Sequence, residues 1–526
     1  MNLAIVAPMN WPHWIIVPVV LPLLAGSLLL LVERRRPQLA WAISLAATLA
    51  LVAVATYLLL QAAGGTIYTY LLGNWQAPFG IALALDRLSA LMLVLTAVVG
   101  LAALLYARAG TAQRGPHFYA LFQYQLMGLS GAFLTADLFN LFVFFEVLLI
   151  ASYGLLLHGA GTQRLRASIH YVTFNLAGSA LFLIAVSLLY GVTGTLNMAD
   201  LALRVAAAPP ENAALIRSAG LLLLVVFCVK AALLPLYFWL PDTYAAATAP
   251  VAALFAIMTK VGIYAIARMY TLVFGADAGA AAHLAQPWLA WLAMGTLALA
   301  ALGVLSAVRL RTLVAYLVVA SAGTLLLALG LGTRGTIAAA LFYLVPSTLV
   351  AAALFLLVDR VKRSRIDGDT MDGSAWSVTP VSLGVLFFVC AVSVGGMPPL
   401  AGFLGKAQLL QAAATSAYPV ASWSVILLSG LAIIFALARA GSSLFWKAPV
   451  DVGGGAAVTP AAASERVALG ILLAALVGVT IAAGPIARYT QAAAVQLTER
   501  RPYITAVLGA RPVPPAWNVR EGMIKP

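Results

Sequence analysis

The stretch FCVKAALLPLYFWLPD, residues 227–242, decides the class of fold. It is apolar almost throughout, as in a helix that spans a membrane, yet it carries Lys230 near its centre, followed by Pro235 and Pro241. An ammonium group at the middle of a bilayer costs about 2.5–3.5 kcal/mol on insertion scales. The chain must therefore offset this cost with a partner for Lys230, or use the charge.

The composition of the whole chain agrees with this stretch. Of its 526 residues, 63% are hydrophobic and only 9% are charged, whereas a soluble domain has about 25% charged residues. The net charge is +14, but the basic residues lie in short loops between apolar runs, where membrane proteins place them. We predict an all-α polytopic membrane protein, embedded in lipid, with no nucleic-acid partner.

Apolar runs of about 20 residues, the length that crosses a bilayer, predict about 14 transmembrane helices. We expect the first run to be a span and not a signal peptide, because no basic segment precedes it. The predicted limits are 14–32, 40–60, 88–106, 118–135, 139–157, 168–191, 219–240, 245–268, 288–305, 313–331, 337–357, 380–411, 422–445 and 467–487.

The basic residues also predict the orientation. If the ERRR run at 33–36 is cytoplasmic, the loops on that side carry sixteen Lys and Arg residues, and the opposite loops carry five. This asymmetry predicts both termini outside the cytoplasm. The C-terminal tail from Arg488 onward adds basic residues on the outer side and opposes the rule.

The kind of charge inside the apolar runs is informative. Lys230, Lys260 and Lys406 lie there, whereas the arginines are almost all in loops or at helix ends. Arginine stays charged when buried, but a buried lysine can lose and regain its proton, so lysine indicates proton handling. Glu146 lies in a similar run, NLFVFFEVLLIASYGLL. Two alternatives stay open: a purely structural ion pair between Lys230 and Glu146, and a Lys260 that extends to the membrane surface.

Two of the predicted helices should be broken. Pro235 follows Lys230, and GGMPPLAGFLGK, with Pro398, precedes Lys406. Proline and glycine interrupt the helical hydrogen bonds, and irregular backbone at membrane depth needs surrounding protein or a water-filled cavity. Two interrupted helices in separate halves of a chain are typical of transporters built from inverted repeats. We therefore interpret Lys230 as one station in a proton path.

Weaker candidates lie at the membrane edges. Asp137 is at a helix end, where capping alone explains it, and His170 is a candidate for a path from the cytoplasmic side. Cys228 and Cys390 are typical of small buried hydrophobic residues. No nucleotide, hydrolase or metal motif occurs where its chemistry would need it. We predict no cofactor, no metal site and a secondary transporter instead of an enzyme.

Three runs resemble a known family. HFYALFQYQLMGLSGAFLTADLFNLFVFFEVLLIASYGLLLHG, residues 117–159, is similar to the D subunit of Mrp-type (Pha, Sha or Mnh) multisubunit cation/proton antiporters. KAALLPLYFWLPDTYAAATAPVAALFAIMTKVGIYAIAR, residues 230–268, and GGMPPLAGFLGK, residues 395–406, fit the wider group that includes the proton-pumping membrane subunits of respiratory complex I. VAYLVVASAG and YGVTGTLNMADLA favour the antiporter branch, particularly its Pha form.

The resemblance implies a fold and a site. It implies a proton-translocating subunit of a Na⁺(K⁺)/H⁺ antiporter in the bacterial inner membrane, with the other subunits of the complex as partners. Its charged axis would run from Glu146 through Lys230, Lys260 and Lys406. The family fold is one transmembrane domain: helices 1–3 in 1–110, a first repeat (helices 4–8) in 111–270, a second, inverted repeat (helices 9–13) in 285–447, and a loop, last helix and tail in 448–526. Helices 7 and 12 would be the broken ones.

One position departs from the family. Many relatives have a histidine where LFYLVPSTLVAAALFLL has Pro346, so Ser347 and Thr348 or water would have to connect Lys260 with Lys406. Two other functions stay open: a proton-pumping subunit of complex I or of a membrane-bound hydrogenase, and a non-translocating scaffold with structural charge pairs. Neither the preference for Na⁺ or K⁺ nor the subunit that passes the cation follows from the sequence.

Overall fold

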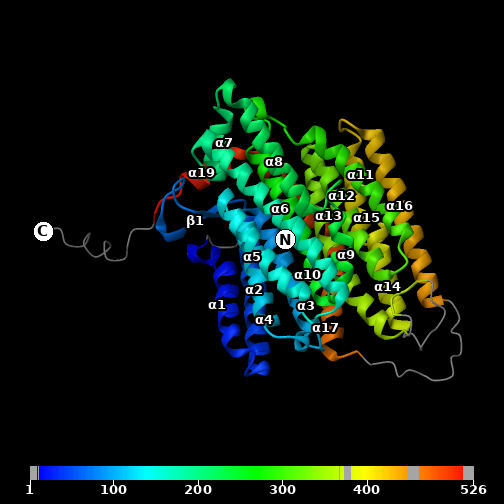
Figure 1. The fold of residues 1–526 in the computed structure, drawn as a ribbon. Coiled ribbons are helices and arrows are strands. Elements are labelled where there is room, and N and C mark those ends of the chain that lie inside the picture. Colours follow the sequence, from blue (N-terminus) through cyan, green and yellow to red (C-terminus); the bar gives the residue numbers. More distant parts are fainter. Residues whose placement is uncertain (1–8, 10, 366–367, 372–380, 447–460, 513–526) are drawn as a thin grey trace, which may run out of the picture.

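The computed structural model describes residues 9, 11–365, 368–371, 381–446 and 461–512, and they form a bundle of α-helices (Figure 1). Most of the predicted loop after 447 and the end of the tail lie outside the described residues. The helices are α1 Val17–Val32, α2 Pro37–Ala63, α3 Arg87–Ala107, α4 Phe118–Leu134, α5 Leu138–Leu157, α6 Thr162–Thr193, α7 Met198–Ala206, α8 Ala213–Ala231, α9 Trp239–Ala246, α10 Ala249–Leu272, α11 Gln286–Ser306, α12 Leu310–Leu331, α13 Arg334–Arg363, α14 Val381–Gly395, α15 Ala401–Ala413, α16 Pro419–Gly441, α17 Ala463–Ile481, α18 Ala483–Thr498 and α19 Arg500–Leu508.

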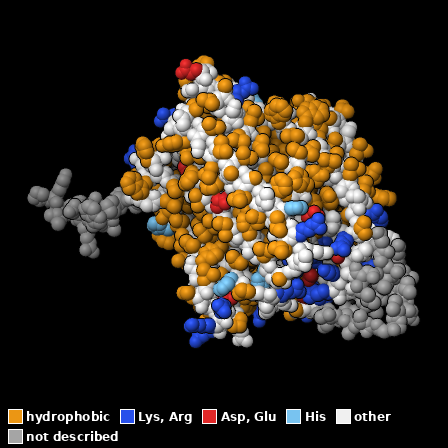
Figure 2. All heavy atoms as spheres, in the orientation of Figure 1, with side chains coloured by type: hydrophobic (Ala, Val, Ile, Leu, Met, Phe, Trp, Pro, Cys, Tyr) orange, Lys and Arg blue, Asp and Glu red, His pale blue; other side chains and the backbone are white. Residues whose placement is uncertain are grey.

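The prediction of a helical membrane protein is confirmed. Eleven helices of the described part are long and apolar enough to cross a membrane, and α1 and α14 are shorter apolar helices. The total of fourteen spans stays a prediction. Hydrophobic side chains cover the middle of the face in Figure 2, and most of the Lys and Arg side chains lie toward its lower edge. This distribution matches a lipid-facing belt with a basic side.

The bundle has an inner set of helices. The most apolar segments of α10 and α13 are completely buried, and that of α12 is 94% buried, whereas the corresponding segment of α16 is only 33% buried. Helices buried on all sides pack against other helices, and half-exposed ones face lipid or partners. A charged group within these apolar segments, such as Lys260 on α10, therefore lies in the protein interior.

Both predicted breaks are confirmed. The seventh predicted span is two helices, α8 and α9, separated by residues 232–238, and the twelfth is α14 and α15, separated by residues 396–400. Pro235 lies in the first break and Pro398 in the second. Each gap leaves backbone carbonyls without their helical partners, and these must be satisfied inside the protein.

Two features were not expected from the sequence. Residues Tyr68–Leu71 (β1) and Ala82–Leu85 (β2) pair as a short antiparallel hairpin, with Tyr68 opposite Leu85. The last predicted helix, 467–487, is instead α17 followed by α18, which continues to Thr498 and packs along α13. Much of the supposed tail is therefore helical, and α19 lies beside α7 (Figure 1).

Candidate functional site

Lys230 is held by a neutral partner. It lies in the last turn of α8 and is 8% exposed, and its ammonium Nζ donates to Asn175 Oδ1 of α6 over 3.2 Å. The ring centroid of Phe145, on α5, lies 5.9 Å from the same Nζ. An amide oxygen and an aromatic face both favour the charged form. Neither carries a formal negative charge.

Glu146 is near Lys230 without forming an ion pair with it. Its Oε1 accepts a hydrogen bond from the hydroxyl of Ser179. Among the described residues, no ion pair joins Glu146 to Lys230, although its carboxylate acts electrostatically on the ammonium group. Ser179 and Asn175 lie four residues apart on α6, so they share a face of that helix. One helix therefore carries the partners of both charged groups.

Two side chains, one donor and one acceptor, hydrogen bond to the backbone around the first break. The indole Nε1 of Trp239 donates to Val229 O over 3.1 Å, and Leu234 N donates to Thr296 Oγ1 of α11 over 2.8 Å. Ala232 has a φ of +56°, the left-handed conformation that ends α8. These contacts fix the end of α8 directly after Lys230.

Two cavities lie along α6 and α9. A small one of about 20 Å³ is lined by Lys230, Asn175 and Trp239 among others, which is room for about one water molecule. A larger one of about 360 Å³ opens at the ends of the same two helices and is lined by His170 and Asp242. Its other lining residues are Gln163, Arg166, Ala167, Ala245, Ala246, Arg309, Arg311, Thr312, Lys362 and Asp369.

Lys260 is a core residue. It is the twelfth of the 24 residues of α10 and is 1% exposed, so it does not extend to the membrane surface, and that alternative is wrong. Its Nζ donates to Ser321 Oγ of α12 over 2.7 Å, and this hydroxyl donates to Val318 O over 2.8 Å. Gly262 lets α10 approach α8, because a Cβ there would lie 2.6 Å from Ala231 N. The helices of the first two lysines are thus in direct backbone contact.

Lys406 is held by the second break itself. It lies on α15, and its Nζ donates to Val394 O over 3.0 Å and to Gly395 O over 3.1 Å, at the end of α14. The C-terminal end of a helix is negative, so it stabilises a cation. Gly396, with a φ of +74°, leaves room for the lysine, because a Cβ there would lie 2.5 Å from Lys406 Cδ.

The residues considered for the link on α13 do not contact either lysine. The hydroxyls of Ser347 and Thr348 both donate to Leu344 O of their own helix, at 3.1 and 2.7 Å. A polar side chain of α13 that sequence reasoning missed is Tyr343, which is buried. Tyr343 also packs on α15, where a Cβ at Gly405 would lie 3.0 Å from its own Cβ.

Asp137 and Asp86 have structural partners. Asp137 caps α5 by accepting from Asn140 N over 2.8 Å. Asp86 pairs with Arg268 over 2.6 Å, so this arginine, predicted to lie at a helix end, is buried in α10. Within the described residues, every ion pair is formed by an arginine and none by a lysine. In the same part of the chain, no group of three or more His, Cys, Asp or Glu side chains could hold a metal.

The chain is similar to antiporter subunits over nearly its whole length. The family model described as "NADH:quinone oxidoreductase/Mrp antiporter, TM" matches residues 135–434. The chain is 44% identical to the D subunit of a probable K⁺/H⁺ antiporter of Rhizobium meliloti (strain 1021), with 95% of this chain and 98% of the relative covered. It is 37% identical to the D subunit of a Na⁺/H⁺ antiporter of Alkalihalophilus pseudofirmus, with 94% and 99% covered.

The fold agrees with a solved complex. A chain in the structure of the Mrp complex from Dietzia sp. DQ12-45-1b superposes with a TM-score of 0.86 at 27% identity, with 95% of this chain and 100% of that chain covered. The family model matches more than half of the chain, and the relatives match over almost all of it. The chain therefore belongs to the NADH:quinone oxidoreductase/Mrp antiporter family of membrane subunits.

Proposed function

We propose that this chain is the proton-translocating subunit of a multisubunit Na⁺ or K⁺/proton antiporter, a secondary transporter in the bacterial inner membrane with both termini outside the cytoplasm. Its partners are the other subunits of that complex. The proton path uses Glu146, Lys230, Lys260 and Lys406 in this order. The choice between Na⁺ and K⁺ stays open, because the named relatives include one K⁺/H⁺ and one Na⁺/H⁺ antiporter subunit.

The observation that carries this proposal is the nature of the partners of three lysines: Lys230 and Lys260, which are buried, and Lys406, which is half-buried. Lys230 bonds to an amide oxygen, Lys260 to a hydroxyl and Lys406 to two carbonyls. A buried lysine that loses its proton beside a carboxylate leaves that carboxylate buried and unpaired, at a cost of several kcal/mol. Beside a neutral oxygen no such charge remains. The lysines are therefore suited to reversible deprotonation, whereas the arginine–carboxylate pairs are suited to holding helices together.

The two cavities on α6 and α9 suggest where a proton reaches Lys230. His170 and Asp242 line the outer cavity, and Asn175 and Trp239 line the inner one. From His170 to Asn175 the rise along α6 is about 7–8 Å. In the proposed path a proton moves from the basic side through these cavities to Lys230. Glu146 then controls the release of the proton from Lys230. It acts through Ser179 and Asn175, which lie on the same face of α6.

The test is proton flux driven by a cation gradient in vesicles that contain the assembled complex. Lys230→Ala should lower the flux by about 100-fold or more, the size of effect typical of a positioned proton-transfer group. Arg204→Ala is the matched control, because Arg204 is a 61% exposed cation that pairs with Asp200 on the surface helix α7. Full flux in an assembled Lys230→Ala complex would contradict the proposal and support a scaffold.

A further inference from the structure

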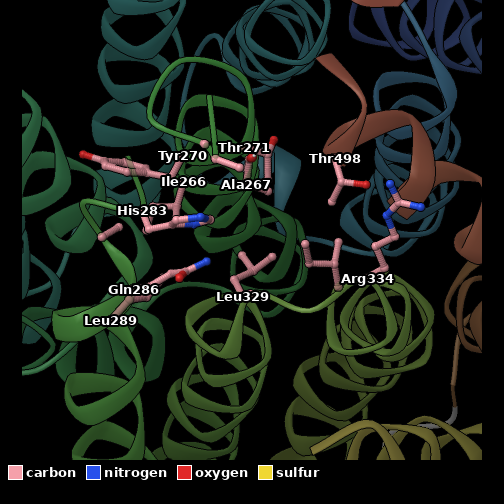
Figure 3. Close-up of a pocket in the computed structure, with 15 residues that line it drawn as sticks. Ile266, Ala267, Tyr270, Thr271, His283, Gln286, Leu289, Leu329, Arg334 and Thr498 are labelled. Atoms are coloured by element: carbon pink, nitrogen blue, oxygen red, sulfur yellow. Dashed lines mark hydrogen bonds between the residues drawn. The ribbon is translucent and has the colours of Figure 1, made fainter. Parts of the chain in front are cut away.

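A separate cavity lies at the C-terminal ends of α10 and α12, the helices that carry Lys260 and its partner Ser321. This end is opposite to the one at which the His170 cavity lies. The cavity has a volume of about 290 Å³ and is bordered by the last turns of α10 and α12 and the first turns of α11 and α13. In Figure 3, His283 and Gln286 lie on one side of it and Thr498 and Arg334 on the other. At about 30 Å³ per molecule, the space is enough for several waters.

The cavity lies about two helical turns from Lys260 along α10. Ala267, in its wall, lies seven residues after Lys260 on α10. Seven residues are two helical turns, so both face the same way, about 10 Å apart along the axis. Leu329, at the other wall, lies eight residues after Ser321 on α12. The two helices that carry Lys260 and Ser321 therefore also form part of the wall of this cavity.

The segment between the cavity and Lys260 is mostly apolar. On α10 it contains Ile263, and on α12 it contains Leu325 and Ala328, all at most 3% exposed. Its two polar side chains, Tyr264 and Thr324, donate to the backbone carbonyls of Phe133 and Ala320. Narrow apolar segments in membrane proteins exclude water at rest and conduct when they hydrate. Such a segment would separate Lys260 from the outer solution until the helices move apart slightly.

The wall is built to stay open and polar. Gly332 has a φ of +67°, and a Cβ there would lie 2.1 Å from Gln286 Nε2, so the absent side chain makes room for this amide. None of the described residues that line the cavity carries a carboxylate. Arg334 lines it and forms an ion pair with Glu499. A site for Na⁺ or K⁺ needs several oxygen ligands, so the lining suits water and protons better than a metal cation.

We propose that this cavity is the aqueous mouth through which Lys260 exchanges protons with the side opposite to the His170 cavity. This inference rests on the proposed function of Lys260. It gives the proton path two mouths at opposite ends: one on α6 and α9 for Lys230, and one on α10 and α12 for Lys260. A proton would reach the second mouth only after passing from Lys230 to Lys260, and Lys406 would lie on the continuation of the path beyond Lys260.

The experiment measures the reaction of single introduced cysteines with a membrane-impermeant methanethiosulfonate reagent, in the assembled complex in vesicles of both orientations. Leu329→Cys and Ala267→Cys should react from the outer side, because the reagent needs a hydrated thiol. Leu302→Cys is the matched control: Leu302 is 61% exposed on α11 but faces lipid, so we expect it to stay unreactive. Absence of reaction at both cavity positions would overturn the proposal, as would equal reaction of the control.

The same variants then test whether protons that pass Lys260 use this cavity. Once Leu329→Cys has reacted, the attached group fills the cavity, and we expect the proton flux to fall at least about tenfold, as for other blocked apolar constrictions. Complete labelling with unchanged flux would overturn the assignment of this mouth to Lys260. The proposed function would still stand in that case, because its test is the flux of Lys230→Ala.

Discussion

In both broken helices the backbone carbonyls at the break need hydrogen-bond donors, and the two breaks supply these donors differently. In the first break the lysine precedes the gap, and the carbonyl of Val229 accepts from the indole of Trp239 and from Ala232 N. In the second break the lysine follows the gap, and the freed carbonyls of Val394 and Gly395 are satisfied by Lys406 itself.

This difference separates two roles. Lys230 is not needed to hold its break together, so its protonation depends on Asn175 and on the field of Glu146. Lys406 both carries a charge and closes the end of α14. A neutral amine still has hydrogen-bond donors, but it loses the attraction of the negative helix end. Loss of a proton from Lys406 should therefore loosen the second break, while loss of a proton from Lys230 should leave the first break intact.

The largest expected effects are those of removing each lysine, and the two variants should differ in thermal stability. Lys406→Ala and Lys230→Ala should both lower proton flux by about 100-fold or more. Only Lys406→Ala leaves two backbone carbonyls without a donor, at about 1–3 kcal/mol for each one that stays buried. Thermal unfolding of the purified complex should show a lower midpoint for Lys406→Ala than for Lys230→Ala. Equal midpoints would show that Lys406 does not hold its break.

The second prediction concerns the neutral partner of Lys230. Asn175→Asp would place a carboxylate at the position of the amide oxygen, 3.2 Å from Nζ, and so favour the charged ammonium. Flux should fall about tenfold, the equivalent of one pH unit of tighter proton binding. Asn175→Ser keeps a neutral oxygen on the same face of α6, one bond nearer the backbone, and is the control. Unchanged flux in Asn175→Asp, measured at several pH values, would contradict the importance of a neutral partner.

The third prediction concerns the residue at each break whose backbone has a left-handed conformation. Gly396→Ala puts a Cβ against Lys406 at a φ of +74°, whereas Ala232→Gly removes a Cβ at a φ of +56°. A left-handed non-glycine residue costs about 1–2 kcal/mol. We expect Gly396→Ala to lower the thermal midpoint and Ala232→Gly to raise it or leave it unchanged. A stabilised Gly396→Ala protein would contradict the close packing of Lys406.

The smallest effect should come from Trp239→Phe. This change keeps an aromatic ring but removes one of the two donors to Val229 O, at about 1 kcal/mol for one hydrogen bond. The thermal midpoint should fall slightly and the flux should stay within about fivefold of normal. Trp288→Phe, an exposed position on α11, is the control. A loss of flux as large as that of Lys230→Ala would mean that the indole belongs to the proton path.

Much of the architecture follows from local sequence. Lys230 and Lys406 stand out because they are charged within apolar runs, and Pro235 and the GGMPP segment mark the breaks because proline and glycine act on the adjacent backbone. The last helix was misjudged for the opposite reason. α18 is only weakly apolar, and its contact with α13 is a tertiary interaction that hydropathy does not report.

The partners of the lysines were not predictable in the same way. Asn175 and Ser321, the partners of Lys230 and Lys260, and Ser179, the partner of Glu146, each lie on a different helix from the charged group, and each is a common polar residue in a membrane helix. Their only sequence signal was the four-residue spacing of Asn175 and Ser179, which places them on one face of α6. Which helix that face meets depends on packing. For the same reason Ser347 and Thr348 seemed suitable, although both hydroxyls bond to their own helix.

The most direct measurement is the charge state of the three lysine side chains by ¹⁵N solid-state NMR of the assembled complex, with Lys→Arg variants for assignment. The shift of Nζ distinguishes an ammonium from a neutral amine. We expect Lys230, Lys260 and Lys406 each to populate the neutral amine at some pH or cation gradient that supports transport. If all three remained ammonium groups under every such condition, neutral partners would not serve reversible deprotonation, and the proposed proton path would be wrong.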